Sequence, residues 1–361
     1  MLVKNIQLKN FRNYPDLNLD VTSQMVVLSG PNAVGKTNLR ESVYFGSVFK
    51  SFRDDAEFIF LKGATAAEIK LQCEKEGEES TLEIYLEKRD KIYANFRING
   101  VKRKRKEAQN FLRVVIFEPS DVDMFAHEPE LRRKYLNMVL SQKDMGYLED
   151  LTNYKKVLSQ KNRLLQDIKT GRGSGESLPA WNNQLIELGS RIIFERKNFI
   201  QFLNQNIAEV YTSISGFHRP VEVEYESLAG DTLEEITENF KHQVDKTGDK
   251  ERLLGTTLVG PHRDDFFLKS EGLYLSPFSS RGELRSQVLA LKILELEYLT
   301  VNGDTPILLL DDVLSELDEN RRTYLLKFLQ GKFQTFITTT HPLEMAAQHV
   351  TLTPSIAEEV E

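Results

Sequence analysis

The sequence predicts an α/β fold in which a head of mixed sheets and helices is split by a mainly helical second lobe. Short strand-like segments separated by turns fill residues 1–118. From residue 128 to about 216 the apolar residues recur at helical spacing, and mixed strand and helix patterns return from about 252. These observations predict a head formed by 1–118 and 252–361, and an inserted lobe formed by 119–251.

The composition is that of an ordinary soluble globular protein. Of 361 residues, 40% are hydrophobic and 28% are charged, which is enough for a sizeable core. Lys and Arg total 47 against 54 Asp and Glu, a net charge of −7, so any contact with nucleic acid would need a local basic patch. The single cysteine, Cys73, excludes an internal disulfide and predicts a buried structural thiol in a reducing compartment.

No targeting or membrane segment is apparent in the sequence. The N-terminus, MLVKNIQLKNF, lacks the charged and then apolar pattern of a signal peptide. No run approaches the roughly 18 apolar residues that a membrane span requires. We therefore expect a cytoplasmic location.

The first part of the head contains alternating or short buried apolar segments that read as strands. They are NIQLKNF (5–11), MVVLSG (25–30), TLEIYLEKR (81–89), YANFRING (93–100) and FLRVVIFEP (111–119).

The inserted lobe contains two apolar stripes at helical spacing. One runs from Leu151 to Ile168 and is interrupted by Lys161, and the other runs from Leu185 to Phe199. The segment between them, GRGSGESLPA, breaks helices. The pattern predicts two antiparallel helices joined by a loose loop.

A phosphate-binding loop is predicted where a strand meets a helix. GPNAVGKTN fits the pattern G-x-x-x-x-G-K-[ST], in which backbone N–H groups cradle phosphates. Lys36 would reach the β- and γ-phosphates, and the Thr37 hydroxyl would bind Mg²⁺. A strand-to-helix turn without a ligand is the alternative. The candidate residues are Gly30, Pro31, Asn32, Ala33, Val34, Gly35, Lys36, Thr37 and Asn38.

A second motif, PILLLDDVLSELD at 306–318, places two carboxylates at the end of an apolar strand. Ligands of open parallel sheets bind at that end of the strands. Asp311 would hold Mg²⁺ directly or through water, and Asp312 would orient or deprotonate an attacking water. The alternative is a buried strand that ends in a solvated acidic turn.

Two further features follow in the same part of the chain. SSRGELRSQ at 279–287 places serines and a glycine where a helix begins, which suits either a helix cap or half of a shared binding site. His341 follows the strand-like QTFI and would contact a γ-phosphate, although a lone histidine is more often an ordinary surface or core residue.

The order of these motifs resembles that of ATP-binding-cassette (ABC) ATPases. SSRGE matches their L-S-G-G-Q signature, with Ser280 and Gly282 retained, Arg281 in place of the first glycine and Glu283 in place of glutamine. The resemblance extends to the RecF family, which is related to the ATPase heads of SMC proteins. It is carried by LKNFRNY, GPNAVGKTNLRESVYF, FEPSDVDMF with PELRRKYLN, GPHRDD, RGELRS with LALKILELE, and LLLDDVLSELD.

The resemblance implies an ATP-dependent DNA clamp with weak, DNA-stimulated ATPase activity. Two molecules would close head to tail on ATP and Mg²⁺, with Ser280 and Gly282 holding the γ-phosphate bound to the other molecule. Such dimers hold double-stranded DNA or junctions of single and double strands, and work with RecO and RecR to load RecA. The implied catalytic residues are Lys36, Asp312 and His341. Arg12, in LKNFRNY, would border the nucleotide or would be a surface arginine at a turn.

Two departures from the superfamily pattern affect the expected chemistry. Asp312 is one methylene shorter than the usual catalytic glutamate, which predicts slow hydrolysis. No Q-loop glutamine is found, and FEPSD (117–121) occupies that region. An SMC head would carry longer arms, and a transporter subunit would need a coupling Q-loop. A DNA-binding scaffold that holds ATP without turnover remains a third alternative.

The candidate DNA contact is a basic run at VKRKRKEAQNFLR (101–113), which contains six basic residues and one acid. Such a run would neutralise phosphates, or it would be a solvated hairpin tip. Arg132 and Arg133 are weaker candidates. GPHRDD (260–265) is interpreted as a buried ion-pair latch in preference to a part of the nucleotide site. The candidate DNA-binding residues are Lys102, Arg103, Lys104, Arg105 and Lys106.

Overall fold

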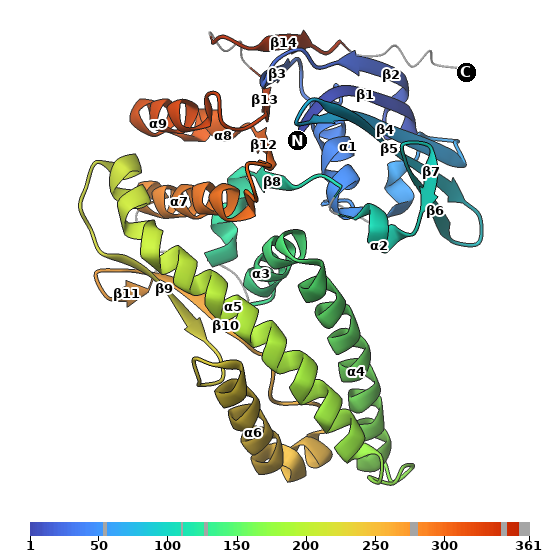
Figure 1. Cartoon of the computed structure of the whole chain (residues 1–361), viewed down its shortest axis with the longest axis vertical. Helices are drawn as coiled ribbons and strands as arrows, with labels where there is room; N and C mark the ends of the chain where they lie inside the picture. The colour runs from blue at the N-terminus through green and yellow to red at the C-terminus, as the bar shows by residue number, and fades with distance from the viewer. Residues whose placement is uncertain (53–55, 110, 126–128, 275–280, 341–344, 354–361) are drawn as a thin grey trace. The chain divides into compact units, whose positions relative to one another are not determined.

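The computed structural model describes the chain apart from residues 53–55, 110, 126–128, 275–280, 341–344 and 354–361 (Figure 1). The chain forms two compact units, Met1–Asp121 with Glu295–Glu361, and Val122–Leu294. The chain thus returns to the first unit at Glu295, whereas the sequence-based division places that return at 252. As a statement about domains, that division stays a prediction.

The first unit contains a six-stranded antiparallel sheet in the order β2-β1-β4-β5-β6-β7. Alternation along its strands buries one face. On β4, for example, Leu71 and Cys73 point inward, and Cys73 is only 1% exposed. This burial confirms the predicted buried cysteine, and it raises the pKa of the thiol to about 12. The strands are β1 (Leu2–Phe11), β2 (Tyr14–Asp20), β4 (Ala66–Lys75), β5 (Glu78–Lys88), β6 (Ile92–Ile98) and β7 (Val101–Arg103).

The first unit also contains a five-stranded sheet in the order β14-β3-β13-β12-β8, in which every pairing is parallel. The carboxyl ends of these strands therefore lie at one edge of the sheet. The strands are β3 (Met25–Ser29), β8 (Val114–Phe117), β12 (Ile307–Asp311), β13 (Thr335–Thr339) and β14 (Gln348–Thr351). The nearly continuous apolar content of β3, β8 and β12 reflects burial on both faces.

Helices of the first unit connect these strands. Helix α1 (Lys36–Val48) is the next element after β3, and it contacts β4, β8, β12 and β13. The shorter segments are η1 (Ala56–Ile59), α2 (Arg105–Ala108), α8 (Val313–Glu316) and α9 (Glu319–Leu329), while η2 (Pro119–Phe125) crosses the boundary between the units.

The second unit contains the predicted helix pair. Helices α4 (Met145–Lys169) and α5 (Leu178–Ser215) lie side by side, and α6 (Leu233–Leu254) packs against both (Figure 1). This unit also includes α3 (Pro129–Lys143) and a three-stranded antiparallel sheet in the order β11-β10-β9. Those strands are β9 (Val221–Glu226), β10 (Asp265–Ser270) and β11 (Leu273–Tyr274). Helix α7 (Arg281–Leu299) begins in this unit and ends in the first.

The charge that interrupts the apolar stripe of α4 has a partner on α6. Lys161 is fully buried, and its Nζ lies 2.8 Å from the Glu251 Oε2 atom. Because a buried ammonium is costly unless it is paired, this contact explains how a lysine is accommodated in the apolar stripe. None of the helices in the described part of the chain is long and apolar enough to cross a membrane.

Candidate functional site

The loop between β3 and α1 has the backbone that the glycine pattern predicts. Gly30 and Gly35 adopt φ values of 145° and 114°, which glycine tolerates and other residues rarely do. A Cβ atom on Gly35 would come within 2.7 Å of both Asn13 and Tyr14. Helix α1 begins at Lys36, so its unpaired N-terminal N–H groups and positive dipole end face this loop, as an anion-binding site requires.

Lys36 folds back over the loop in this structure. Its Nζ atom donates to the carbonyl oxygens of Gly30, at 2.6 Å, and Pro31, at 2.7 Å. Burial lowers the pKa of the ammonium, whereas Asp312 and Asp311 raise it. The ammonium is thus held beside the loop by neutral carbonyl groups, which an anionic ligand could replace.

The two carboxylates predicted at the end of β12 lie at the same edge of the sheet. Asp311 is the last residue of β12, and its Oδ1 atom accepts a hydrogen bond of 2.5 Å from the Thr338 hydroxyl on β13. Asp312 follows with φ 53°, in the left-handed region, and its N–H donates to the Thr338 carbonyl at 3.2 Å.

A cavity of about 490 Å³ joins the loop to these carboxylates. That volume is within the range of small-molecule sites. The parallel pairing of β3, β13 and β12 brings the loop and the acidic strand together. The cavity is lined by Asn32, Ala33, Gly35, Lys36, Thr37, Asn38, Pro119, Asp311, Asp312, Thr338, Thr339 and Thr340.

Two residues that contact the loop from outside the cavity lining, Asn13 and Tyr14, were not anticipated from the sequence. Asn13 donates to the Val34 carbonyl at 3.1 Å and accepts from Asn38 at 2.8 Å, and the Tyr14 hydroxyl donates to the Gly35 carbonyl at 3.1 Å. The β1–β2 turn therefore braces the loop from outside. Asn13 and Tyr14 directly follow LKNFR in the sequence. This segment has no phosphate-binding pattern, so the sequence offers little indication that they contact the loop.

Arg12 lies outside the set of residues that line the cavity. Its guanidinium donates to both carboxylate oxygens of Glu41, at 3.0 and 2.6 Å, and to the Phe58 carbonyl at 2.8 Å. These contacts tie the β1–β2 turn to α1. The geometry gives Arg12 a structural role, and its predicted contact with nucleotide stays a prediction.

The residues present fit a Mg²⁺ ion that arrives with a nucleotide. Thr37 and Asp311 face the same cavity and offer one hydroxyl and one carboxylate. Mg²⁺ commonly binds to one or two carboxylates and to substrate phosphates. Among the described residues there is no cluster of three or more His, Cys, Asp or Glu side chains that could hold a metal unaided.

The remaining predicted nucleotide contacts are only partly visible. Gly282 lies in the first turn of α7, where its carbonyl accepts from the Ser286 hydroxyl at 2.9 Å. Ser280 and His341 lie outside the residues that the structure describes. Their assignments stay predictions.

The predicted basic run forms the second strand of a hairpin, β7, and the short helix α2 that follows it. Asn99 and Gly100, both with positive φ, form the two-residue turn between β6 and β7. Lys102, Arg103 and Lys104 are exposed after this turn. Arg105 donates instead to the Phe49 carbonyl at the end of α1, at 2.8 Å, so part of the run serves the packing of α2.

The alternative basic pair on α3 is engaged within the second unit. The buried Arg132 side chain donates through Nε and Nη2 to the two carboxylate oxygens of Asp265, at 2.7 and 2.8 Å. Arg133 donates to the Asp264 carbonyl at 2.9 Å. The suggestion that Arg132 is available to DNA is therefore wrong, because its charge is neutralised and buried.

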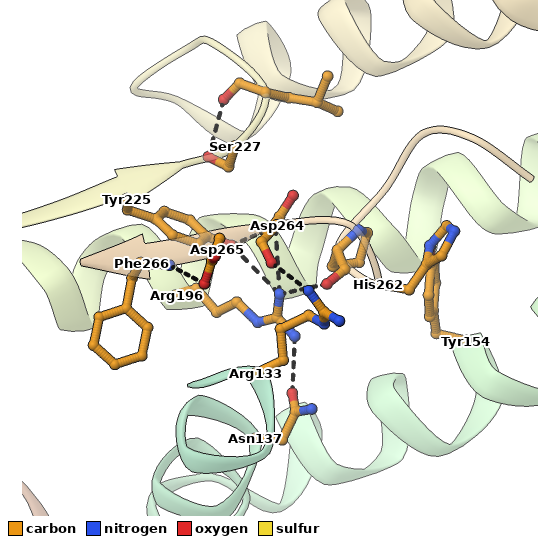
Figure 2. Close-up of polar contacts among 12 residues, drawn as sticks. Arg133, Asn137, Tyr154, Arg196, Tyr225, Ser227, His262, Asp264, Asp265 and Phe266 are labelled. Carbon is orange, nitrogen blue, oxygen red and sulfur yellow. Dashed lines mark hydrogen bonds and ion pairs between the residues drawn. The ribbon is translucent and has the colours of Figure 1, made fainter. Parts of the chain in front are cut away.

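GPHRDD forms part of a buried polar network in the second unit (Figure 2). Arg196 on α5 donates to the Pro261 carbonyl at 2.7 Å and lies 3.3 Å from the Asp264 carboxylate. Asp264 also accepts from the Tyr225 hydroxyl, and His262 Nδ1 pairs with the Tyr154 hydroxyl at 2.7 Å. This arrangement agrees with the interpretation of the segment as a buried latch.

Comparison with known proteins gives one consistent family. The model of the RecF/RecN/SMC N terminal domain matches residues 2–358. The DNA replication and repair protein RecF of Agathobacter rectalis is 35% identical over 351 residues, which cover 94% of this chain and 92% of that protein. RecF of Bacillus cytotoxicus is 37% identical over 350 residues, with the same coverage of 94% and 92%.

Solved structures agree with the sequence relatives. One described as the recombination mediator protein RecF-ATP in the RecFOR pathway is 33% identical, covers 98% of this chain and 96% of its own, and has a TM-score of 0.90. An Smc head bound to the C-winged helix domain of ScpA is 12% identical with a TM-score of 0.56, which supports the fold alone. The predicted ABC-type ATPase head fold is thereby confirmed, and the chain belongs to the RecF family.

Proposed function

We propose that this protein is an ATP-dependent DNA clamp of recombinational repair. Two copies bind ATP between them, hold double-stranded DNA or a junction of single and double strands, and release it on slow hydrolysis. The proposed partners are RecO and RecR, with which the clamp assists the loading of RecA. The full-length similarity to RecF proteins supports this role, including the similarity to a structure described as RecF-ATP in the RecFOR pathway.

The observation that carries the proposal is the cavity at the carboxyl edge of the parallel sheet. It brings a glycine loop and a helix N-terminus to one side, and two carboxylates to the other. Phosphates are bound by the first pair of features, and catalysis of phosphoryl transfer requires the second. A nucleoside triphosphate that is hydrolysed with a bound metal uses both.

In this proposal the residues of the chain have separate tasks. Lys36 leaves the carbonyl oxygens of Gly30 and Pro31 and binds the β- and γ-phosphates, while N–H groups of the loop hold the phosphate chain. Asp312 orients the attacking water and accepts its proton. Thr37 and Asp311 would hold Mg²⁺, which would supply positive charge to neutralise the phosphates.

The neighbouring molecule completes the site in this proposal. The signature segment with Ser280 and Gly282 contacts the γ-phosphate of the other copy, and His341 contacts the γ-phosphate from the same copy. ATP thereby becomes part of the dimer interface, so its hydrolysis weakens the clamp.

Oligomeric state measured by light scattering tests the composite site. ATP with Mg²⁺ should produce dimers of the wild-type chain, and both Lys36→Ala and Ser280→Arg should remain monomeric. Lys36→Ala should also lose nucleotide binding, whereas Ser280→Arg should retain it, because only the former removes a contact within one chain. The proposal would be contradicted if the molecular mass of the wild type did not change when ATP is added, or if either variant formed dimers.

A DNA-binding scaffold without turnover is the second candidate. Asp312 stands where a catalytic base is expected, and its side chain is one methylene shorter than the usual glutamate. This shorter reach favours a scaffold that does not hydrolyse ATP. Dimer formation with ATP in the absence of any phosphate release, with or without DNA, would identify the scaffold.

A further inference from the structure

A buried arginine connects the acidic strand to the loop after β8. Arg40 lies one helical turn after Lys36 on α1 and is fully buried. Its Nη2 atom donates to the Asp311 Oδ2 atom at 2.9 Å and to the Glu118 Oε1 atom at 2.7 Å. With Thr338 on the other oxygen, both oxygens of Asp311 are held before any metal is bound.

Arg40, Glu118 and Asp311 form a set in which one positive charge is shared by two negative charges. One guanidinium lies between two carboxylates, so the set carries a net charge of −1, the same as Asp311 would carry alone. Glu118 therefore offsets the positive charge that Arg40 brings to the site. The Phe52 ring lies beneath the guanidinium, with 4.8 Å between Cζ and the ring centroid, and leaves that face of Arg40 without solvent.

Arg40 uses only part of its hydrogen-bonding capacity. Its Nε and Nη1 atoms are buried without an acceptor among the described residues. A buried arginine with a purely structural role is normally satisfied, as Arg132 is by Asp265 and the Met124 carbonyl. One nitrogen of Arg40, Nη2, donates to both carboxylates. It can therefore stay bound to one carboxylate when a different cation binds the other.

We propose that Arg40 is a positioning residue that holds Asp311 in the metal-free site and gives it up when Mg²⁺ enters with nucleotide. Arg40 then stays paired with Glu118, which keeps the displaced positive charge from opposing the metal. This inference rests on the proposed binding of nucleotide and Mg²⁺ in the cavity. Arg40 touches neither substrate nor attacking water in this role.

Removal of the charge on Arg40 and removal of the charge on Glu118 should shift the Mg²⁺ requirement in opposite directions. Arg40→Met leaves two neighbouring carboxylates without a counter-charge, so the Mg²⁺ concentration for half-maximal nucleotide binding should fall about tenfold. Glu118→Gln leaves Arg40 paired with Asp311 alone, which changes the net charge of the set from −1 to 0, so that concentration should rise about tenfold. The double variant restores the balance and should return close to the wild type.

The experiment measures binding of a fluorescent ATP analogue to the full-length chain while Mg²⁺ is titrated. Arg191→Met is the matched control, because Arg191 also bridges two carboxylates, Asp150 and Glu187, but lies in the second unit. This control should leave the Mg²⁺ dependence unchanged. A purely structural role of Arg40 predicts shifts in the same direction for both single variants, and that outcome, or no shift, overturns the inference.

The outcomes separate this inference from the proposed function. Failure of the wild type to bind the analogue at any Mg²⁺ concentration would refute nucleotide binding itself. Binding by the wild type without opposite shifts would refute only the role of Arg40. If Arg40→Met does not fold, Glu118→Gln decides alone, because an unchanged or lower Mg²⁺ requirement contradicts the predicted rise.

Discussion

Asp312 adopts a backbone conformation that few side chains tolerate. Its φ of 53° lies in the left-handed region, which Asn and Asp occupy more readily than other residues with a Cβ atom. The N–H group donates to the Thr338 carbonyl, and the Asp312 carbonyl accepts from the Ser315 hydroxyl at 2.6 Å. Such held, strained positions often occur at functional sites, which supports a role for this carboxylate.

Asp312→Asn tests that role without disturbing the turn, because asparagine also tolerates the left-handed region. If the carboxylate accepts the proton of the attacking water, phosphate release should fall at least about a hundredfold. ATP-dependent dimers should persist, since the phosphate contacts are unchanged. Phosphate release and light scattering measured on the same preparation check both statements, and equal release by wild type and variant would argue against a catalytic Asp312.

At this scale, the predictable residues are those whose neighbours in space are also neighbours in sequence. The loop at 30–38 and the pair Asp311 and Asp312 could be found because their patterns are local. Arg40 could not, because its partners lie 78 and 271 positions away along the chain. Arg132 was misinterpreted for the same reason, since Asp265 is 133 positions distant.

Among the elements, the β6–β7 hairpin separates the basic run into two functions. Arg105 closes the end of α1 through the Phe49 carbonyl, although all five basic residues from Lys102 to Lys106 are exposed. Because Arg105 is engaged with Phe49, a DNA phosphate contact would draw on the other exposed basic residues of the run.

Neutralising that strand should reduce the salt dependence of DNA binding. The slope of the logarithm of affinity against the logarithm of salt concentration falls by about 0.9 for each lost phosphate contact. The slope should therefore become shallower in a triple glutamine variant at Lys102, Arg103 and Lys104. A matched triple glutamine variant on α6 should not change it, and carries the changes at Lys241, Lys246 and Lys250. Fluorescence anisotropy at several salt concentrations measures both, and equal slopes would exclude the hairpin.

The elements themselves were predicted with uneven success, for physical reasons. The strands β1, β3, β5, β6 and β8 contain alternating or short continuous apolar segments, and the helix pair α4 and α5 has apolar residues at helical spacing. The three-stranded sheet of the second unit was missed, since β9 and β10 pair across a segment that contains α6. Strand order in both larger sheets depends on such distant pairings, which periodicity does not encode.

For the whole molecule, two titratable groups of the second unit, the partly exposed His262 and the buried Asp264, respond to acid in opposite senses. Burial is the main cause that lowers the pKa of His262 to about 4, and also the main cause that raises the pKa of Asp264 to about 6. Between pH 6.5 and 4 the unfolded chain binds more protons at His262, so acidification costs stability there. At Asp264 the folded chain binds more protons between pH 6 and 3.8, so acidification adds stability.

His262→Asn should reveal the opposing contribution. The variant has no histidine whose protonation favours the unfolded chain. Its free energy of unfolding should therefore rise relative to that of the wild type as the pH falls from 6.5 to 4. Because one pKa unit corresponds to 1.36 kcal/mol, the relative gain is about 2 kcal/mol after allowance for the partly exposed ring. Urea unfolding followed through Trp181, the single tryptophan of the chain, reports this unit. Parallel pH profiles of variant and wild type would contradict the assignment.

The left-handed turn at Asp312 also has an evolutionary consequence. A codon for aspartate becomes one for glutamate by a single nucleotide change, so the longer acid is always within mutational reach. The backbone at this position disfavours it, because glutamate lacks the local hydrogen bonding that lets Asp and Asn occupy the left-handed region. A lineage that acquired the longer acid would first have to relax the turn. Selection on the backbone can therefore keep aspartate at this position without any selection on the rate of hydrolysis.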